Sequence, residues 1–238
     1  MIIGINGKIG SGKDTVGKII QWLTKPELDG QYIGFQTYDD YTLEKLSPFK
    51  IKKFAGKLKQ IASLLTGIDV EKFEDQEFKK TYLSEEWGAV RRNPLQAIPV
   101  FKDIQFNEMM TVREFLQILG TEAMRDNLHE NVWVNALFAD YKEEIYRSEV
   151  PTRAAGFIDH YVYPKWIITD MRFPNELESV VLRNGLTIRV VRPGSSTGLH
   201  TSETALDDTE FHYNIINDGT IEDLVEKVRE VLIKENII

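Results

Sequence analysis

A glycine-rich stretch near the start of the chain, Gly4–Thr15 (GINGKIGSGKDT), limits the fold of this protein more than any other feature. Residues 7–13 fit the first seven places of a phosphate-binding P-loop, G-x-x-x-x-G-K, whereas the eighth place holds Asp14 instead of Ser or Thr. A short apolar run precedes the glycines, and apolar residues at helical spacing follow them. A P-loop requires this order of strand, loop and helix, because backbone N–H groups at a helix start bind anions.

The side chains of the loop fit this use. Lys13 is placed to reach the β- and γ-phosphates of a nucleotide. The eighth-place hydroxyl ordinarily ligates Mg²⁺, and Thr15, one residue on, is where several nucleoside monophosphate kinases carry theirs. Asp14 then has two interpretations: it holds Mg²⁺ through water, or it faces solvent at the helix N-terminus, where a carboxylate is favoured. Three glycines allow backbone turns that a Cβ would obstruct, namely Gly7, Gly10 and Gly12.

Short apolar runs alternate with helical patterns along the chain. Five runs are expected to be strands: residues 1–6, 51–54, 166–169, 186–191 and 213–216. Six helices are expected: one after the glycine loop, one around residues 58–65, one from Thr111, one at 131–146, one at 174–185 and one from Thr220. Strands that alternate with helices indicate an α/β fold with a parallel sheet wound on both sides.

Several helix ends carry explicit signals. Thr111 and Glu114 form a capping box, and Pro174 suits the first position of a helix. Gly67 and Gly185 are expected to close the helices that precede them. Apolar residues at helical spacing predict four buried faces: Val16, Ile19, Ile20 and Leu23; Leu58, Ile61, Ala62 and Leu65; Val112, Phe115, Leu116 and Leu119; Trp133, Ala136, Leu137 and Tyr141.

We expect one domain, residues 1–238, with polar segments inserted between its elements. Residues 24–50 have scattered Gly and Pro without a clear period, which predicts a loop or small excursion. Residues 68–110 are charged and aromatic without a sustained period, and they predict the largest insertion. Residues 151–165 are punctuated by Pro and Gly, and residues 193–212 form a polar stretch that begins after one strand and ends before the next.

Composition limits the class of partner. The formal net charge is −8, whereas a protein that binds nucleic-acid backbone usually carries a basic face. Small anionic substrates need only a few well-placed cations and remain compatible with this charge. No apolar run approaches the roughly 20 residues of a membrane span, and the absence of cysteine excludes disulfides and thiolate metal sites. We therefore expect no nucleic-acid partner, no membrane and a cytoplasmic location.

Charged residues near strand ends supply further candidates. Asp170 ends an apolar strand, as does a Walker B carboxylate that helps to hold Mg²⁺, although many strands end in Asp merely to cap the next turn. Phosphoryl transfer is mostly positioning and charge neutralisation, so a kinase of small phosphates needs arginines. Arg172 has the best position, two residues after Asp170 at the mouth of the sheet. The arginine candidates are Arg113, Arg125, Arg172 and Arg192.

Several segments, taken together, resemble the bacteriophage deoxynucleoside monophosphate kinases of the T-even-like type. They keep the order of that family and span most of the chain outside residues 24–50 and 68–110. The same family carries Asp in the eighth place of the loop, so Asp14 fits a G-K-D-T form. The resembling pieces are Ser11–Thr15 (SGKDT), Phe54–Lys59 (FAGKLK), Val112–Thr121 (VREFLQILGT), Asp170–Glu176 (DMRFPNE), Val191–Gly194 (VRPG), His200–Glu203 (HTSE) and Asn217–Gly219 (NDG).

The resemblance implies a three-layer P-loop kinase core with lid and acceptor-binding insertions. It also implies Mg-ATP as phosphoryl donor and a deoxynucleoside 5′-monophosphate as acceptor. By similarity, Thr15 and Asp170 lie near the metal, and Arg192 lies over the donor adenine. We place the lid in residues 193–212 and the acceptor cover in residues 68–110. The ATP phosphates would meet Gly10, Ser11, Gly12, Lys13, Asp14 and Thr15; the adenine would meet Asn217, Asp218 and Gly219; the acceptor or transferred phosphoryl would meet Arg113, Arg125 and Arg172.

Two other classes stay open from the residues alone. Another small-molecule P-loop kinase, acting on dephospho-coenzyme A, phosphomevalonate or a nucleoside, would share these core motifs. An ATPase stimulated by nucleic acid is disfavoured by the net charge of −8 and by the lack of a basic, aromatic-rich tract. Closed homodimers are the commonest symmetric assembly, so a homodimer is the default expectation. If the gene belongs to a phage, the expected location is the cytoplasm of the host.

Overall fold

A computed structural model describes residues 1–26, 34–87, 89–90, 107–149, 157–194 and 204–238. The chain divides into two compact units, the first of which joins Met1–Phe54 to Val134–Ile238, while the second is Ala55–Trp133. Helix α3 (Phe54–Thr66) begins with the last residue before the second unit, and α5 (Val132–Phe138) begins near the end of that unit. Within the described residues, no helix has both the length and the apolar character needed to cross a membrane.

The first unit is built on a parallel β-sheet, as the alternation of strands and helices predicted. Its strands are β1 (Ile2–Gly7), β2 (Phe49–Lys52), β7 (Lys165–Met171), β8 (Leu186–Val191) and β9 (Tyr213–Ile216). The sheet has the order β2-β7-β1-β8-β9, so β1 lies in its centre. Gly4 pairs with Ile168 of β7 and with Thr187 of β8. The carboxyl end of β1, where the glycine loop begins, therefore lies between two neighbouring strands.

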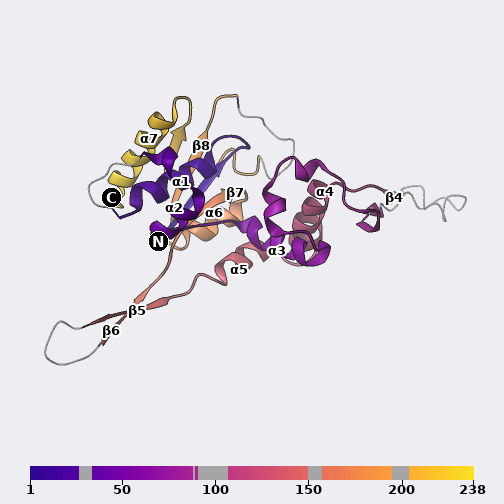
Figure 1. Cartoon of the computed structure of the whole chain (residues 1–238), viewed down its shortest axis with the longest axis horizontal. Helices are drawn as coiled ribbons and strands as arrows, with labels where there is room; N and C mark the ends of the chain where they lie inside the picture. Colours follow the sequence, from indigo (N-terminus) through magenta and orange to yellow (C-terminus); the bar gives the residue numbers. More distant parts are fainter. Residues whose placement is uncertain (27–33, 88, 91–106, 150–156, 195–203) are drawn as a thin grey trace, which may run out of the picture. The chain divides into compact units, whose positions relative to one another are not determined.

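Helices cover both faces of this sheet and make a three-layer arrangement (Figure 1). The helices are α1 (Lys13–Thr24), α2 (Asp40–Leu46), α6 (Pro174–Val181) and α7 (Ile221–Lys234), with a 3₁₀ turn η1 (Phe35–Thr37). Ile3 and Ile5 of β1 belong to the core cluster that includes the buried residues of α1 and α7. Gly4 points the other way, because successive residues of a strand alternate between faces. A Cβ on Gly4 would lie 3.3 Å from Val180 of α6, so α6 covers the second face.

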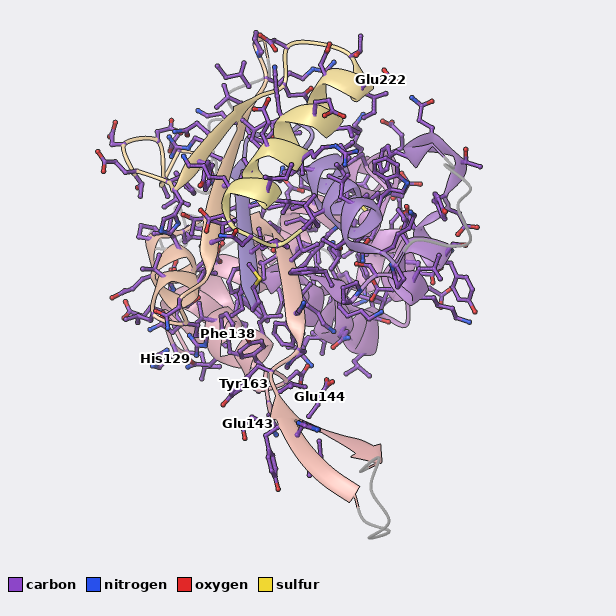
Figure 2. The ribbon with its side chains drawn as sticks, turned by 90° about the vertical axis from the view of Figure 1, so that its left-hand side faces the viewer. His129, Phe138, Glu143, Glu144, Tyr163 and Glu222 are labelled. Atoms are coloured by element: carbon purple, nitrogen blue, oxygen red, sulfur yellow. The ribbon has the colours of Figure 1, made fainter. Side chains whose placement is uncertain are left out.

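An antiparallel hairpin precedes β7 in the chain. It pairs β5 (Glu144–Glu149) with β6 (Phe157–Val162). Aromatic rings join its base to the sheet: Tyr141 stacks on Tyr163 with centroids 5.1 Å apart, and meets Trp166 edge-on at 4.8 Å. Figure 2 shows Tyr163 at this base of the hairpin. The start of β7 is thereby packed through Trp166 against Tyr141, which in turn stacks on Tyr163.

The second unit has a small core of its own. Phe73 and Val112 are fully buried there, and Phe115 is 7% exposed. Lys59 of α3 is 7% exposed and forms an ion pair with Glu74 at 2.5 Å, as a buried charge requires. The remaining elements of the unit are η2 (Val70–Glu74), η3 (Phe78–Lys80), η4 (Glu85–Trp87), β3 (Ala89–Val90), β4 (Asn107–Glu108), α4 (Val112–Gln117) and the π-helix η7 (Ile118–Asp126).

Local sequence signals predicted several of these elements well. Strands β8 and β9 have the predicted bounds. Thr111 caps α4 through the predicted capping box with Glu114, and Thr220 is the N-cap of α7. Pro174 is the first residue of α6, as expected from the missing N–H of proline.

The predicted helix at residues 131–146 is too long. Helix α5 ends at Phe138, and residues 144–149 form strand β5 instead. The segment 157–162, inside the predicted loop, pairs with it as β6. Tyr141 extended the helical pattern by its spacing from Leu137, but its ring is half-buried because it stacks in the aromatic cluster and not because it belongs to a helix.

The segment 24–50 contains a helix, α2, where a loop was predicted. Asp39 caps it by accepting the Thr42 N–H at 2.7 Å. Only Leu43 of this helix is buried, so no apolar period marks it in the sequence. The strand expected at 51–54 begins two residues earlier, at Phe49, and it ends at Lys52 because Phe54 already starts α3.

Two helix-end predictions also need correction. Asn184, with φ 53°, takes the left-handed position after α6 that was expected of Gly185. Gly185 is required instead by close packing, because a Cβ there would lie 2.8 Å from the Val180 carbonyl oxygen. Leu65 is half exposed, so it does not belong to the buried face of α3. Gly67, with φ 72°, does close α3 as predicted.

Candidate active site

The glycine loop follows β1 and leads directly into α1. Gly10 and Gly12 have φ of 78° and 97°, which is the left-handed region that glycine adopts without strain. The Ser11 N–H donates to the Lys8 carbonyl at 3.1 Å and closes the turn. A Cβ on Gly7 would lie 2.4 Å from Ser11 Oγ, so Gly7 is needed for close approach within the loop. The backbone of the loop thus has the tight course that a phosphate cradle requires.

Two polar side chains are buried inside this loop. Lys13 is 9% exposed, and its ammonium donates to the Lys8 carbonyl at 3.3 Å, across the loop. Ser11 is fully buried, and its hydroxyl has no hydrogen-bond partner within the described part of the chain. Buried polar groups are nearly always hydrogen-bonded. A bound anion could accept from the Ser11 hydroxyl beside the charge of Lys13, so the loop fits phosphate.

Asn217, which follows β9, is tied to the glycine loop. Its side-chain amide donates to the Ser11 carbonyl at 2.9 Å, and its backbone N–H donates to the Val191 carbonyl at 2.7 Å. A Cβ on Gly12 would lie 2.5 Å from the Asn217 amide nitrogen, so this contact leaves no room for a side chain at Gly12. The predicted adenine-side residue is therefore in direct contact with the predicted phosphate loop.

Asp218 and Gly219 form the turn before α7. Lys227 donates to Asp218 Oδ1 and to the Ile216 carbonyl, both at 2.7 Å. The hydrogen bond from Lys227, with the charge of its ammonium, holds the pKa of Asp218 below its ordinary value. A Cβ on Gly219 would lie 2.4 Å from a carboxylate oxygen of Asp223, which caps the helix. Residues of α7 thus fix this turn. The other predicted adenine-side residue, Arg192, is exposed just after β8.

Asp14 binds to the sheet through its carboxylate. Thr169 of β7 is fully buried and donates its hydroxyl to Asp14 Oδ1 at 2.7 Å. The ammonium of Lys53 lies 3.6 Å from the same oxygen, and the Asp14 side chain is 58% exposed. Partial burial by itself raises the pKa of Asp14, but the Thr169 hydroxyl, Lys53 and Lys13 outweigh it and hold the pKa below its ordinary value. Asp14 is therefore an ionised carboxylate fixed at the start of α1.

Asp170 lies beside this group at the end of β7. Its Oδ1 accepts the backbone N–H of Phe54 at 2.8 Å, at the first residue of α3. This contact caps the start of α3 and not the turn that follows β7, and the metal role of Asp170 stays a prediction. Thr15 is half-buried in the first turn of α1. Among the described residues, no three His, Cys, Asp or Glu side chains gather into a metal cluster.

That donor set fits magnesium better than a metal held by protein alone. Mg²⁺ is usually held by one or two carboxylates, water and substrate phosphates. Asp170 and Thr15 could supply oxygen ligands of this type, and Thr15 directly follows the loop that fits phosphate. The residues therefore match an ion that would arrive with a nucleotide.

Arg172 is positioned by a buried carboxylate that the sequence analysis did not select. Glu176 is 3% exposed and accepts the backbone N–H groups of Arg172 and Phe173 at 2.8 and 3.1 Å. It stands at the third position of α6, where glutamate commonly reaches back over a helix start. The acidic residue after Pro174 was the available signal for this contact. Glu176 thus fixes the turn that carries Arg172.

Arg113 and Arg125 belong to the second unit, whereas the glycine loop belongs to the first, and the acceptor-side role of these arginines stays a prediction. Arg113 donates to Gln76 Oε1 at 3.1 Å. Arg125 lies near the end of the π-helix η7, a helix type that is frequent at functional sites. The Trp133 indole N–H donates to the Gly120 carbonyl at 2.8 Å, which satisfies one carbonyl of that helix.

The described end of the predicted lid, residues 204–212, contacts both β8 and the glycine loop. Leu206 is buried, and Arg189 of β8 donates to the carbonyls of Leu206 and Asp207. Asp207 also forms an ion pair with Lys8 at 2.9 Å. No sequence signal pointed to this pair, because its members are separated by most of the chain. The earlier part of the predicted lid includes residues 195–203, which lie outside the described residues.

Comparison with known proteins adds a family to this geometry. Residues 57–228 match the family model described as deoxynucleotide monophosphate kinase. The chain is 26% identical to the deoxynucleotide monophosphate kinase of Enterobacteria phage T4, over 59% of this chain and 61% of that protein. It is 29% identical to the protein of the same name from Escherichia phage RB69, over 53% and 46% of the two chains. The deoxynucleoside-5′-monophosphate kinase of Escherichia phage T5 is 28% identical over 75% and 70%.

The alignments set the scope of this relationship. The chain spans 61% of the T4 protein and 46% of the RB69 protein, which is less than two thirds of each. The family model begins after the glycine loop, so the loop is an independent indication of nucleotide binding. Since the model covers the chain from Lys57 in α3 to Val228 in α7, this chain belongs to the deoxynucleotide monophosphate kinase family.

Proposed function

We propose that this chain transfers the γ-phosphoryl group of ATP to deoxynucleoside 5′-monophosphates, giving the diphosphates and ADP. One observation carries the proposal: Lys13 and the Ser11 hydroxyl, which has no hydrogen-bond partner among the described residues, are buried in the glycine loop that follows the central strand of a parallel sheet. Family membership and the names of the phage relatives supply the acceptor.

In this proposal, the first unit binds the donor. The loop N–H groups and Lys13 hold the ATP phosphates at the N-terminus of α1, where the helix dipole favours anions. Thr15 and Asp170 would hold Mg²⁺, which would supply positive charge to offset the charge of the ATP phosphates. Arg192 and the turn at 217–219 lie on the adenine side. The contact of Asn217 with Ser11 would link the two ends of the nucleotide site.

The transfer is a direct in-line displacement without a covalent intermediate. The chain contributes positioning and positive charge, because a phosphoryl transition state spreads negative charge over its oxygens. Arg172, held by Glu176, is the candidate at the transferred phosphoryl group. Arg113 and Arg125 are the candidates for the acceptor phosphate. A lid in residues 193–212 and a cover in residues 68–110 would exclude water, which otherwise hydrolyses ATP.

The test is product analysis with a matched inactive variant. The purified protein is incubated with Mg-ATP and, separately, dAMP, dCMP, dGMP, dTMP and the corresponding ribonucleotides, and ADP and diphosphates are followed by chromatography. A deoxynucleoside diphosphate that is absent with Lys13→Ala supports the proposal. ATP bound without transfer to any monophosphate would overturn it and direct the search to coenzyme A precursors, phosphomevalonate or nucleosides. ATP hydrolysis stimulated by DNA would instead indicate the nucleic-acid ATPase.

Residues 193–212 and 68–110 are tested by limited proteolysis. We expect ATP together with a monophosphate to slow cutting in both segments, because closure would bury their backbone. The control is each nucleotide alone. Equal cutting in all samples would contradict the lid and the cover. Light scattering on the same preparation tests the expected homodimer.

A further inference from the structure

Lys53 follows β2 and is bound by two acidic residues of the site, Asp14 at its side chain and Asp170 at the peptide that follows it. Its ammonium lies 3.6 Å from Asp14 Oδ1, and its side chain is 29% exposed. The peptide that joins it to Phe54 donates its N–H to Asp170 Oδ1 at 2.8 Å. Lys53 is thus fixed through its side chain by Asp14 and through its backbone by Asp170.

The negative charge of Asp14 at the start of α1 has to be balanced before phosphates can bind there. An ordinary P-loop has a neutral hydroxyl in the eighth place, whereas this chain has a carboxylate next to Lys13, on the first turn of α1. A negative charge there opposes the binding of phosphates, because like charges repel across a few ångströms. Thr169 fixes the carboxylate by a hydrogen bond but does not neutralise it. The ammonium of Lys53, which lies 3.6 Å from the same oxygen, supplies the opposite charge.

We propose that Lys53 is a positioning residue that neutralises Asp14 and keeps its carboxylate against Thr169, so that the loop can admit a polyphosphate. The inference deepens the proposed function and rests on it for the identity of the nucleotide. Lys53 acts through Asp14 and not by contact with the phosphates. Its role therefore exists only while Asp14 is a carboxylate, which makes the role separable by mutation.

The neighbouring lysine provides a matched control. Lys52 precedes Lys53, but strand residues alternate in direction. The Lys52 ammonium lies 5.4 Å from the centroid of the ring of Trp166, a residue of β7, and forms a cation–π pair with it. Lys52→Met removes the same charge from the same segment and leaves Asp14 untouched. Lys53→Arg keeps the charge at position 53.

The experiment measures binding of inorganic tripolyphosphate and of ATP by calorimetry in magnesium-free buffer, so that only the charges of the chain act. We expect Lys53→Met to weaken both ligands about tenfold, the effect of one unbalanced and partly exposed charge. Lys52→Met should bind as wild type does, and Lys53→Arg should restore most of the affinity. Thermal unfolding of each variant shows that it is folded.

A double-mutant cycle with Asp14→Asn completes the test. The asparagine keeps an oxygen for the Thr169 hydroxyl but has no charge, so Lys53→Met should then change the affinity less than twofold. The same tenfold loss in the Asp14→Asn background would overturn the proposal, because Lys53 would then touch the phosphates directly. Wild-type affinity of Lys53→Met would overturn it as well.

Failure of the proposed function gives a different pattern. Tripolyphosphate binding that depends on Lys53 and Asp14, without any transfer to deoxynucleoside monophosphates, would leave this inference standing and remove the kinase assignment. Phosphoryl transfer by a Lys53→Met variant whose affinity for ATP and tripolyphosphate is unchanged would leave the kinase assignment standing and overturn this inference. A wild-type chain that binds neither tripolyphosphate nor ATP would overturn both.

Discussion

Replacing Gly17 with alanine is expected to destabilise the protein, although alanine is the better helix former. Gly17 lies in the middle of α1, on the side that packs against the sheet. A Cβ there would lie 2.7 Å from Thr169 Cγ2, 3.5 Å from Ile167 Cγ2 and 3.6 Å from Ile51 Cδ1. The first distance is below any normal contact. The Thr169 methyl cannot turn away cheaply, because the hydroxyl on the same Cβ donates to Asp14 at 2.7 Å.

Two opposing terms decide the magnitude. Alanine in a helix interior is favoured over glycine by about 1 kcal/mol. Inserting a methyl into a packed interior costs about 1–3 kcal/mol, and rotation of Thr169 to escape would also lose a hydrogen bond to a charged group, worth about 1.5–3 kcal/mol. The clash therefore outweighs the helix preference. We expect Gly17→Ala to lower the free energy of unfolding by about 1–2 kcal/mol.

The measurement is urea unfolding followed by tryptophan fluorescence, for which Trp22 of α1 and Trp166 of β7 are buried probes. Thr169→Ser keeps the hydroxyl and removes the methyl, so it should cost about 1 kcal/mol alone and should restore stability when combined with Gly17→Ala. Gly56→Ala is the control, since a Cβ there meets nothing within 4 Å. A Gly17→Ala variant at least as stable as wild type, or one that Thr169→Ser fails to restore, would refute this reasoning.

Three further predictions concern the loop and its supports. Lys13→Ala should lower kcat by at least about a hundredfold and should change the free energy of unfolding much less, since the hydrogen bond of the ammonium to the Lys8 carbonyl is worth about 1 kcal/mol. Activity loss with a collapsed melting temperature would contradict this. Thr169→Val should have a lower free energy of unfolding than wild type at neutral pH, and this difference should narrow below about pH 4. The reason is that the lowered pKa of Asp14 contributes stability that is lost as the carboxylate is protonated. Equal differences in urea unfolding at pH 7 and 3.5 would argue against it. Asn217→Ala should weaken ATP binding more than Lys227→Ala does, since Asn217 donates to the Ser11 carbonyl in the loop whereas Lys227 donates to Ile216 and Asp218, and calorimetry compares the two.

The parts of the fold that local chemistry determines could be predicted. Apolar runs and turn residues placed β8 and β9 with their observed bounds. The capping box at Thr111 and the proline at position 174 marked helix starts, because these signals act within one turn. The glycine pattern likewise marked the loop, and its left-handed glycines agree with that pattern, although the contacts of the loop with Asn217 and Asp207 come from distant parts of the chain.

The parts that depend on register or on distant partners could not. The pairing of Lys53 with Asp14 needs β2 beside β7, and the cap on Phe54 needs the same register with Asp170. A π-helix at residues 118–126 does not follow the 3.6-residue period on which helix prediction rests. At Tyr141 the period predicted a helix that is not there, because the ring is half-buried by stacking in the aromatic cluster and only happens to have helical spacing from Leu137.

The hydrogen bond from Phe54 to Asp170 restricts which residues can stand at position 170. Asparagine would keep an oxygen for the N–H but lose the negative charge, whereas glutamate would keep the charge and carry it one methylene further from the helix start. Alanine would lose both. Phe54 is also the last residue before the chain enters the second unit. A replacement at this one position would therefore act on two parts of the protein, the carboxyl edge of the sheet and the first turn of the helix that leaves it.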